Sequence, residues 1–175
     1  MGMLSQKAIF MVNNRVLKSK FFGKAIQMAG FYTSSEDYEH GTKLLEEKIK
    51  QGYSIIVFPE GTRSRTSKIQ RFHKGAFYLA EKLQLDILPV LIRGNADLLP
   101  KDDNVLKTGK MTLEYLPVIQ PNDERFGENY SQRTKKISQY FKEKFIELKR
   151  KTEDETYFEK KLGYNYIYKP RFIQK

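Results

Sequence analysis

The feature that most constrains the fold is the alternation of short apolar runs with segments of helical periodicity. The runs are rich in β-branched and aromatic residues and have the length of strands, whereas the segments between them place apolar residues three and four positions apart. The strand-like runs span residues 7–12, 53–58 and 86–92, and the helix-like segments span residues 18–32, 41–52 and 74–84. Strands separated by helices of about ten residues are typical of α/β proteins. We therefore predict a single α/β domain with a mostly parallel central sheet flanked by helices.

Two of these segments allow specific burial predictions. Residues 53–58 form an unbroken apolar run, which predicts a strand that is buried on both faces. In residues 41–52 the helical spacing predicts one inward face, and Gly52 follows as a stop signal. The residues expected on that face are Leu44, Leu45, Lys48 and Ile49.

The character of the sequence changes at Pro121 and Asn122. Before this point, residues 111–118 alternate apolar and polar side chains, which predicts a half-exposed strand. After it, residues 131–151 form a long basic segment with one apolar stripe, made of Ile137, Tyr140, Phe141, Phe145 and Leu148. We therefore expect residues 1–122 to form the α/β domain and residues 123–175 to form a basic helical extension with a tail rich in tyrosine and lysine.

Composition excludes several classes of site. The chain of 175 residues has no cysteine and two histidines, so disulfides and thiolate chemistry are excluded and an all-protein zinc site is not predicted. The apolar runs are far shorter than the roughly 18 residues of a membrane-spanning helix. No signal peptide is visible, and we expect an intracellular protein.

The net charge of +11 is concentrated at the two ends of the chain. Residues 1–35 hold five basic and no acidic side chains, and residues 123–175 hold 14 basic and 9 acidic ones. A basic protein is attracted to polyanions such as nucleic acids, anionic lipid surfaces and phosphorylated ligands. Charge alone does not choose among these partners.

The sequence "VFPEGTRSR", residues 57–65, follows a strand-like run with a turn that carries a carboxylate and two guanidinium groups. In open α/β sheets, ligands bind at the carboxyl ends of the strands. Gly61 permits close approach of the backbone, and Arg63 can bind phosphate through two parallel hydrogen bonds. Residues 58–75 carry five basic groups against Glu60 alone. The residues therefore predict a site for phosphate or a phosphate ester.

The same stretch resembles the most diagnostic motif of the glycerolipid acyltransferases, the family of 1-acylglycerol-3-phosphate acyltransferase. The resemblance continues in "RFHKGAFYLA", "DILPVLIRG" and "SKFFGKAIQMAGFY", and it covers roughly residues 8–122. It implies transfer of an acyl group from acyl-CoA or acyl carrier protein to a hydroxyl of a (lyso)phosphatidate-like acceptor, without a further cofactor. By this resemblance Arg63 binds the acceptor phosphate, Glu60 and Ser64 support it, and Gly61 and Thr62 supply the backbone geometry.

Two departures from the family pattern concern the chemistry. The reaction needs a general base, which the family supplies from an H-x-x-x-x-D motif. Here Leu45 stands five residues after His40 and Tyr78 stands five residues after His73, so neither histidine fits. We expect that the chain begins after the position of the motif and is inactive for that reason, and that His73 is a polar loop residue. The family's intermediate arginine is also missing from "AGFYTSSEDYEHG".

Two alternatives from other functional classes remain open. The basic ends are consistent with a non-catalytic module that binds anionic lipid or a membrane surface. Aromatic residues among the basic ones are consistent with nucleic-acid binding, but no nucleic-acid fold signature supports it, and nucleic acid is not an expected partner. The leading hypothesis places the protein in the cytoplasm, peripherally at the inner face of the membrane.

Overall fold

The computed structural model describes residues 7–12, 32–33, 38–62, 64, 68–98 and 108–152. Its first layer is a small parallel sheet made of β1 (Ala8–Val12), β2 (Tyr32–Thr33) and β3 (Ser54–Val57) in the order β2-β1-β3. Residues Ala8 to Met11 of β1 pair in register with β3, with Ile9 opposite Ile55. The parallel pairing confirms the predicted α/β class, because parallel strands need a crossover connection such as the helix between β2 and β3.

Helix α3 (Tyr38–Lys50) leads from β2 into β3. It is followed by Gly52, whose φ of +82° suits the end of a helix. Leu45 is buried at 2% exposure, but Leu44 is 41% exposed, so its predicted position on the inward face is wrong. Consecutive residues are about 100° apart around a helix, and the buried stripe follows Thr42 and Leu45 rather than Leu44.

The second layer is an antiparallel pair of strands, β4 (Val90–Arg93) and β5 (Thr112–Tyr115), with the short helix α5 (Asn95–Leu98) between them. The strand predicted over residues 86–92 starts late because Pro89 has no N–H to donate. Before it, Ile87 makes only an isolated antiparallel bridge with Ile119. A Cβ on Gly94, at φ +90°, would lie 2.2 Å from the Lys110 carbonyl oxygen, so the chain needs glycine where β4 ends.

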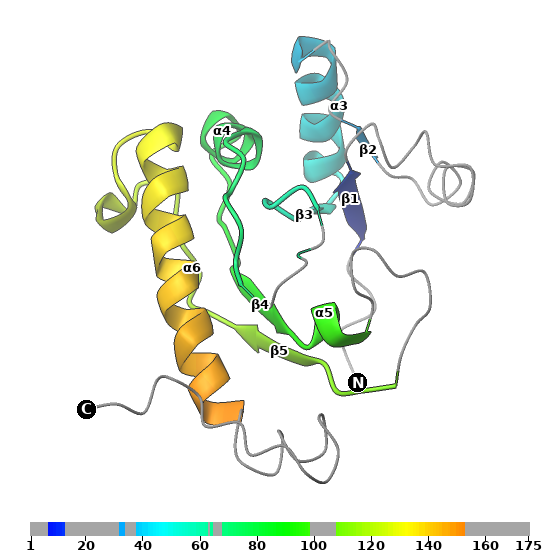
Figure 1. The fold of residues 1–175 in the computed structure, drawn as a ribbon. Helices are drawn as coiled ribbons and strands as arrows, with labels where there is room; N and C mark the ends of the chain where they lie inside the picture. Colours follow the sequence, from blue (N-terminus) through cyan, green and yellow to red (C-terminus); the bar gives the residue numbers. More distant parts are fainter. Residues whose placement is uncertain are drawn as a thin grey trace, which may run out of the picture.

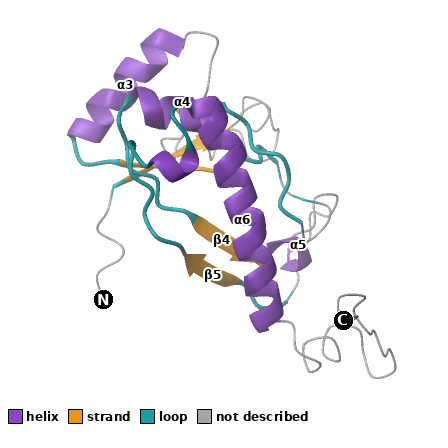
Figure 2. Ribbon diagram, turned by 90° about the vertical axis from the view of Figure 1, so that its left-hand side faces the viewer, coloured by secondary structure: helices purple, strands orange, loops and turns teal. Residues whose placement is uncertain are grey.

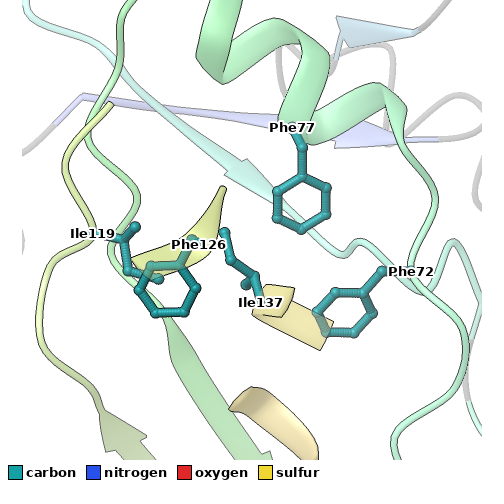
Figure 3. Close-up of a cluster of buried hydrophobic side chains, with 5 residues drawn as sticks. All are labelled: Phe72, Phe77, Ile119, Phe126 and Ile137. Atoms are coloured by element: carbon teal, nitrogen blue, oxygen red, sulfur yellow. The ribbon is translucent and has the colours of Figure 1, made fainter. Parts of the chain in front are cut away.

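Helix α6 (Tyr130–Thr152) packs against β4 and against α4 (Gly75–Lys82), and a 3-10 turn (Glu124–Phe126) precedes α6. Figure 1 shows α6 running down one side of the molecule beside α4, and Figure 2 shows it crossing β4 and β5. The main core lies between these elements and contains Phe72, Phe77, Ile119, Phe126 and Ile137 (Figure 3). A second cluster joins α6 to the strands through Leu91, Leu116, Phe145 and Leu148.

The apolar stripe predicted for α6 is confirmed. Ile137, Phe145 and Leu148 are buried, and Tyr140 and Phe141 are half-buried against the same clusters. The start of α6 is also tied to the preceding chain, because the buried Arg133 guanidinium donates to the carbonyl oxygens of Gln120 and Pro121. Residues 120–152 therefore share the core of the α/β layers.

The expectation that residues 53–58 are buried on both faces is wrong. Burial alternates along β3, with Ile55 and Val57 half-buried, Ile56 36% exposed and Phe58 55% exposed. Among the described residues, side chains cover one face of this strand more than the other. The helix predicted over residues 18–32 lies outside the described residues except at Tyr32, and so does the tail from residue 153. No helix among the described residues is long and apolar enough to cross a membrane.

Candidate functional site

The candidate site is the turn that follows β3, made of residues Phe58 to Thr62 together with Ser64. The Gly61 N–H donates to the Phe58 carbonyl oxygen at 3.0 Å, which closes the turn directly after the strand. Gly61 has a φ of +66°, a conformation that other L-residues adopt at a cost in free energy. The sequence folds this way because proline, glutamate and glycine follow the strand, and glycine stands where positive φ is required.

Glu60 fixes the turn to a segment ten residues later. Its Oε2 atom accepts a hydrogen bond of 2.7 Å from the backbone N–H of Gln70. The carboxyl is half-buried, and this burial raises its pKa, while the Gln70 hydrogen bond opposes the increase. One carboxylate oxygen is thus used to hold the backbone together, at the electrostatic cost of partial desolvation.

Residues 68–73 run back along the turn through further hydrogen bonds. The His73 N–H donates to the Pro59 carbonyl oxygen at 2.8 Å. The Gln70 side-chain amide donates to Ser64 Oγ and to the Lys68 carbonyl oxygen, both at 3.1 Å. The Ser64 hydroxyl donates to the same Lys68 carbonyl oxygen at 3.3 Å. Together with the Glu60–Gln70 contact, these hydrogen bonds join residues 59–64 to residues 68–73.

The His73 ring lies directly against Gly61. A Cβ built on Gly61 would be 3.0 Å from Cδ2 and 3.2 Å from Nε2 of His73. The ring is solvent-exposed, so it contacts the turn from the outside. The absence of a side chain at Gly61 therefore admits the imidazole as well as the positive φ.

The structure brings together four of the five residues predicted for the site: Glu60, Gly61, Thr62 and Ser64. Thr62 is exposed, and Ser64 is half-buried and hydrogen-bonded to Gln70 and Lys68. Arg63, the predicted phosphate ligand, lies outside the described residues, as does Arg65. Sequence reasoning did not find Gln70, because no motif or periodicity marks a residue that acts through its backbone N–H ten positions away.

The charge around the turn is positive. Lys68, Arg71 and Lys74 on the returning segment are exposed, and Glu60 is the acidic residue of the turn itself. Within the described ranges no group of three histidine, aspartate or glutamate side chains is placed to hold a metal ion. A hollow of about 560 Å³ lies elsewhere, between α3 and the end of α4, and none of its lining residues belongs to the turn. The turn is thus suited to an anionic ligand held at an open surface.

Comparison with known proteins decides the family. The sequence profile of the family described as Acyltransferase matches residues 1–93, which is more than half of the chain. The chain belongs to the glycerolipid acyltransferase family. The matched range contains β1, α3, β3, α4 and the turn of residues 58–62 and 64, which we call the clamped turn because Glu60 and Pro59 bind it to Gln70 and His73. The family resemblance inferred from the motifs is therefore confirmed.

Three curated relatives show the extent of the similarity. The chain is similar to a 1-acyl-sn-glycerol-3-phosphate acyltransferase of Chlamydomonas reinhardtii, with 33% identity over 75 residues that cover 42% of this chain and 23% of the relative. The LPAT1 enzyme of Arabidopsis thaliana is 35% identical over 68 residues, which cover 38% and 19% of the two chains. The 1-acyl-sn-glycerol-3-phosphate acyltransferase of Saccharomyces cerevisiae is 33% identical over 106 residues, which cover 57% of this chain and 35% of the relative. The matched region thus spans a fifth to a third of these relatives.

One solved structure has the same fold. The 1-acyl-sn-glycerophosphate acyltransferase PlsC of Thermotoga maritima matches with a TM-score of 0.64 and 24% identity. The match covers 84% of this chain and 59% of that chain. The agreement extends beyond the range of the family profile and supports the mixed α/β architecture with a small parallel sheet.

Proposed function

We propose that the protein has the acceptor-binding function of a glycerolipid acyltransferase, and that the clamped turn after β3 binds the phosphate of a (lyso)phosphatidate-like acceptor, whether or not this chain, which has no H-x-x-x-x-D motif, transfers the acyl group. The observation that carries this proposal is the double attachment of the turn, through Glu60 to Gln70 and through Pro59 to His73. Family membership and the names of the relatives support the reaction class.

The physical argument concerns preorganisation. A phosphate binds more tightly when the backbone of its site is already fixed, because binding then costs less conformational entropy. Here the two ends of the loop are held by hydrogen bonds of 2.7 and 2.8 Å, and Arg63 lies in sequence between Glu60 and Ser64. An arginine at this position would supply two parallel hydrogen bonds to the ligand, and Lys68, Arg71 and Lys74 would add attraction over a longer range.

The transfer itself exchanges one bond for another. The acceptor hydroxyl oxygen forms a bond to the carbonyl carbon of the acyl thioester, the carbon–sulfur bond breaks, and the thiol of CoA or of the carrier protein leaves. The proton of the hydroxyl must pass to a base. We assign no such base among the described residues, and we propose that the turn provides acceptor binding rather than proton transfer.

An assay of thiol release tests this proposal. The chain has no cysteine, so a thiol-reactive dye reports CoA released from acyl-CoA without background from the protein. If the chain transfers acyl groups to lysophosphatidate, Arg63→Ala should lower kcat/KM at least tenfold and Arg63→Lys should recover only part of it, because lysine lacks the planar fork. Arg125→Ala, which removes one positive charge from the 3-10 turn, is the control.

If the wild-type chain shows no acyl transfer, the same variants test the turn in a binding assay. The proposal for the turn then requires wild-type protein to bind lysophosphatidate and Arg63→Ala to bind it at least tenfold more weakly. Equal values for wild type, Arg63→Ala and Arg125→Ala in both assays would contradict it. Comparison of acyl-CoA with acyl carrier protein as co-substrate would identify the donor.

A second candidate function, peripheral binding to an anionic membrane surface, is favoured by the charge on α6. The helix carries eight basic and two acidic side chains. Lys135 and Lys142 are exposed and one heptad apart, about 10 Å along the same side of the helix, and Lys136 and Arg150 are also exposed. Each basic residue near an anionic lipid surface contributes about 1 kcal/mol to binding. We propose that this face of α6 lies on the inner face of the membrane.

Vesicle co-sedimentation tests the second candidate. Lys135→Glu combined with Lys142→Glu should reduce binding to vesicles with 30% phosphatidylserine by at least tenfold at low salt, on the order of 1 kcal/mol per lost cation. Lys43→Glu combined with Lys50→Glu on α3, where both lysines are also exposed, is the control for the same change in net charge. Binding that is insensitive to salt, or equal loss in both variants, would contradict a specific role of α6.

A further inference from the structure

The contact between His73 and Gly61 carries an inference about ligand recognition. The backbone of His73 is anchored to the turn, since its N–H donates to the Pro59 carbonyl oxygen at 2.8 Å. Its ring is placed as well, because Cδ2 and Nε2 lie 3.0 and 3.2 Å from the point where a Gly61 Cβ would be. Both the main chain and the side chain of His73 are therefore held at the turn.

The chemistry of the ring suits an anion. An imidazole donates a hydrogen bond from Nε2 in one neutral tautomer and in the cation. The ring is exposed, and the structure gives its nitrogens no partner among the described residues. A ligand that approaches the Gly61 backbone would thus meet an available donor on the side where a Cβ would otherwise stand.

The charged groups on the two joined segments favour a phosphoryl oxygen as the partner. Lys68, Arg71 and Lys74 lie on the returning segment with His73. Glu60 is the acidic group on the turn, and its Oε2 atom is occupied by the Gln70 N–H. Positive charge on the same segment raises the affinity for a dianionic phosphate monoester.

We propose that His73 is a second ligand of the acceptor phosphate, donating a hydrogen bond from Nε2 to a phosphoryl oxygen held at the turn. The inference rests on the proposed function of the turn and adds a contact that the octet "FPEGTRSR" does not contain. In this arrangement Gly61 has two tasks, because its positive φ shapes the turn and its lack of a side chain leaves room for the imidazole.

The two histidines of the chain make a direct test possible by NMR. The probe is sn-glycerol 3-phosphate, added to wild-type protein while the imidazole C–H signals and the backbone amides are followed. We expect the His73 signals to shift with saturation, in parallel with the amides of residues 60–62. The signals of His40, which lies in the first turn of α3, should stay constant and serve as an internal control.

Affinity measurements on variants complete the test. His73→Ala should weaken binding of sn-glycerol 3-phosphate about tenfold, which corresponds to the loss of one hydrogen bond to a charged group. His73→Gln should recover most of this loss because its amide can donate, and His40→Ala should bind as wild type does.

The outcomes separate the two proposals. Shifts of the turn amides without a saturable shift of His73, or equal affinity of His73→Ala and His40→Ala, would overturn the role of His73 and leave the phosphate site intact. If neither the turn amides nor His73 respond to the probe, the proposed function of the turn fails first. The wild-type NMR titration decides the question even if His73→Ala does not fold.

Discussion

Arg133 and Glu60 are both withdrawn from water, wholly or in part, and they are used differently. Arg133, at the start of α6, is 5% exposed and donates to two backbone carbonyl groups, those of Gln120 and Pro121. Glu60, at the turn after β3, is half-buried and accepts from a single backbone N–H, that of Gln70. Arginine remains charged under these conditions, whereas burial raises the pKa of Glu60.

The difference in hydrogen bonding distinguishes a contact that stabilises the fold, at Arg133, from a candidate binding site, at Glu60. At Arg133 the buried charge is matched by two carbonyl acceptors, and the result is a junction between residues 120–121 and the start of α6. At Glu60 the hydrogen bond offsets only part of the desolvation, so the carboxylate is held where it is not most stable. Incomplete compensation of this kind is common at functional sites, where geometry is kept at the expense of stability.

The largest effect on stability is expected from Arg133→Ala. Removal of the guanidinium leaves the carbonyl groups of Gln120 and Pro121 without their donor, which should lower the free energy of unfolding by about 2–3 kcal/mol. Urea denaturation followed by circular dichroism measures this change. Arg125→Ala, which removes an exposed guanidinium paired with Asp123, is the matched control and should change stability less than Arg133→Ala does.

Phosphate-ester binding by Arg133→Ala tests whether Arg133 affects the turn as well as stability. Arg133→Ala should retain it at temperatures where the variant is folded, because Arg133 makes no contact with the turn among the hydrogen bonds described. A loss of binding as large as that of Arg63→Ala would show that the two regions are not separable.

A smaller effect is expected from Glu60→Ala. The Gln70 N–H would lose its acceptor, at a cost of about 1 kcal/mol in the free energy of unfolding. Relief of the desolvated carboxylate works in the opposite direction, so this value is an upper bound. The variant should nevertheless bind the phosphate ester more weakly, because one end of the loop is no longer fixed. Wild-type affinity in Glu60→Ala would contradict the role of the Glu60–Gln70 contact.

The smallest effect, and the most diagnostic one, is expected from Glu60→Gln as a function of pH. The amide oxygen can still accept from Gln70, but it does not titrate. Because the pKa of Glu60 is raised in the folded state, the native protein binds more protons than the unfolded chain, and wild-type stability falls as pH rises from the unfolded pKa, about 4.5, through the folded one. Glu60→Gln should gain stability relative to wild type across this window. A relative stability that decreases with pH would reverse the assignment.

The sequence was sufficient for the class of fold and for the position of the turn. The β-branched run before Pro59 predicts a strand, and a glycine at position 61 together with clustered arginines predicts a tight turn that can approach an anion. The apolar stripe of α6 could also be predicted, because 23 residues of helix give many repeats of the same period. These features depend on local sequence alone.

The remaining features depend on tertiary contacts. Gln70 and His73 reach the turn through backbone N–H groups, which every residue other than proline possesses, so their side-chain types give no signal. Leu44 and Phe58 are apolar but exposed, since burial depends on which face another element covers. Arg133 is basic in a basic helix, and only the position of Gln120 and Pro121 shows that it is structural.

The central claim is that the turn after β3 holds a phosphate ester through Arg63, and isothermal titration with a short-chain lysophosphatidate tests it most directly. The account predicts saturable binding by the wild-type protein, at least a tenfold loss in Arg63→Ala, and an unchanged affinity in Arg125→Ala, which removes the same charge from the 3-10 turn. Equal affinities in all three proteins, or weakening of the two variants to the same extent, would contradict it.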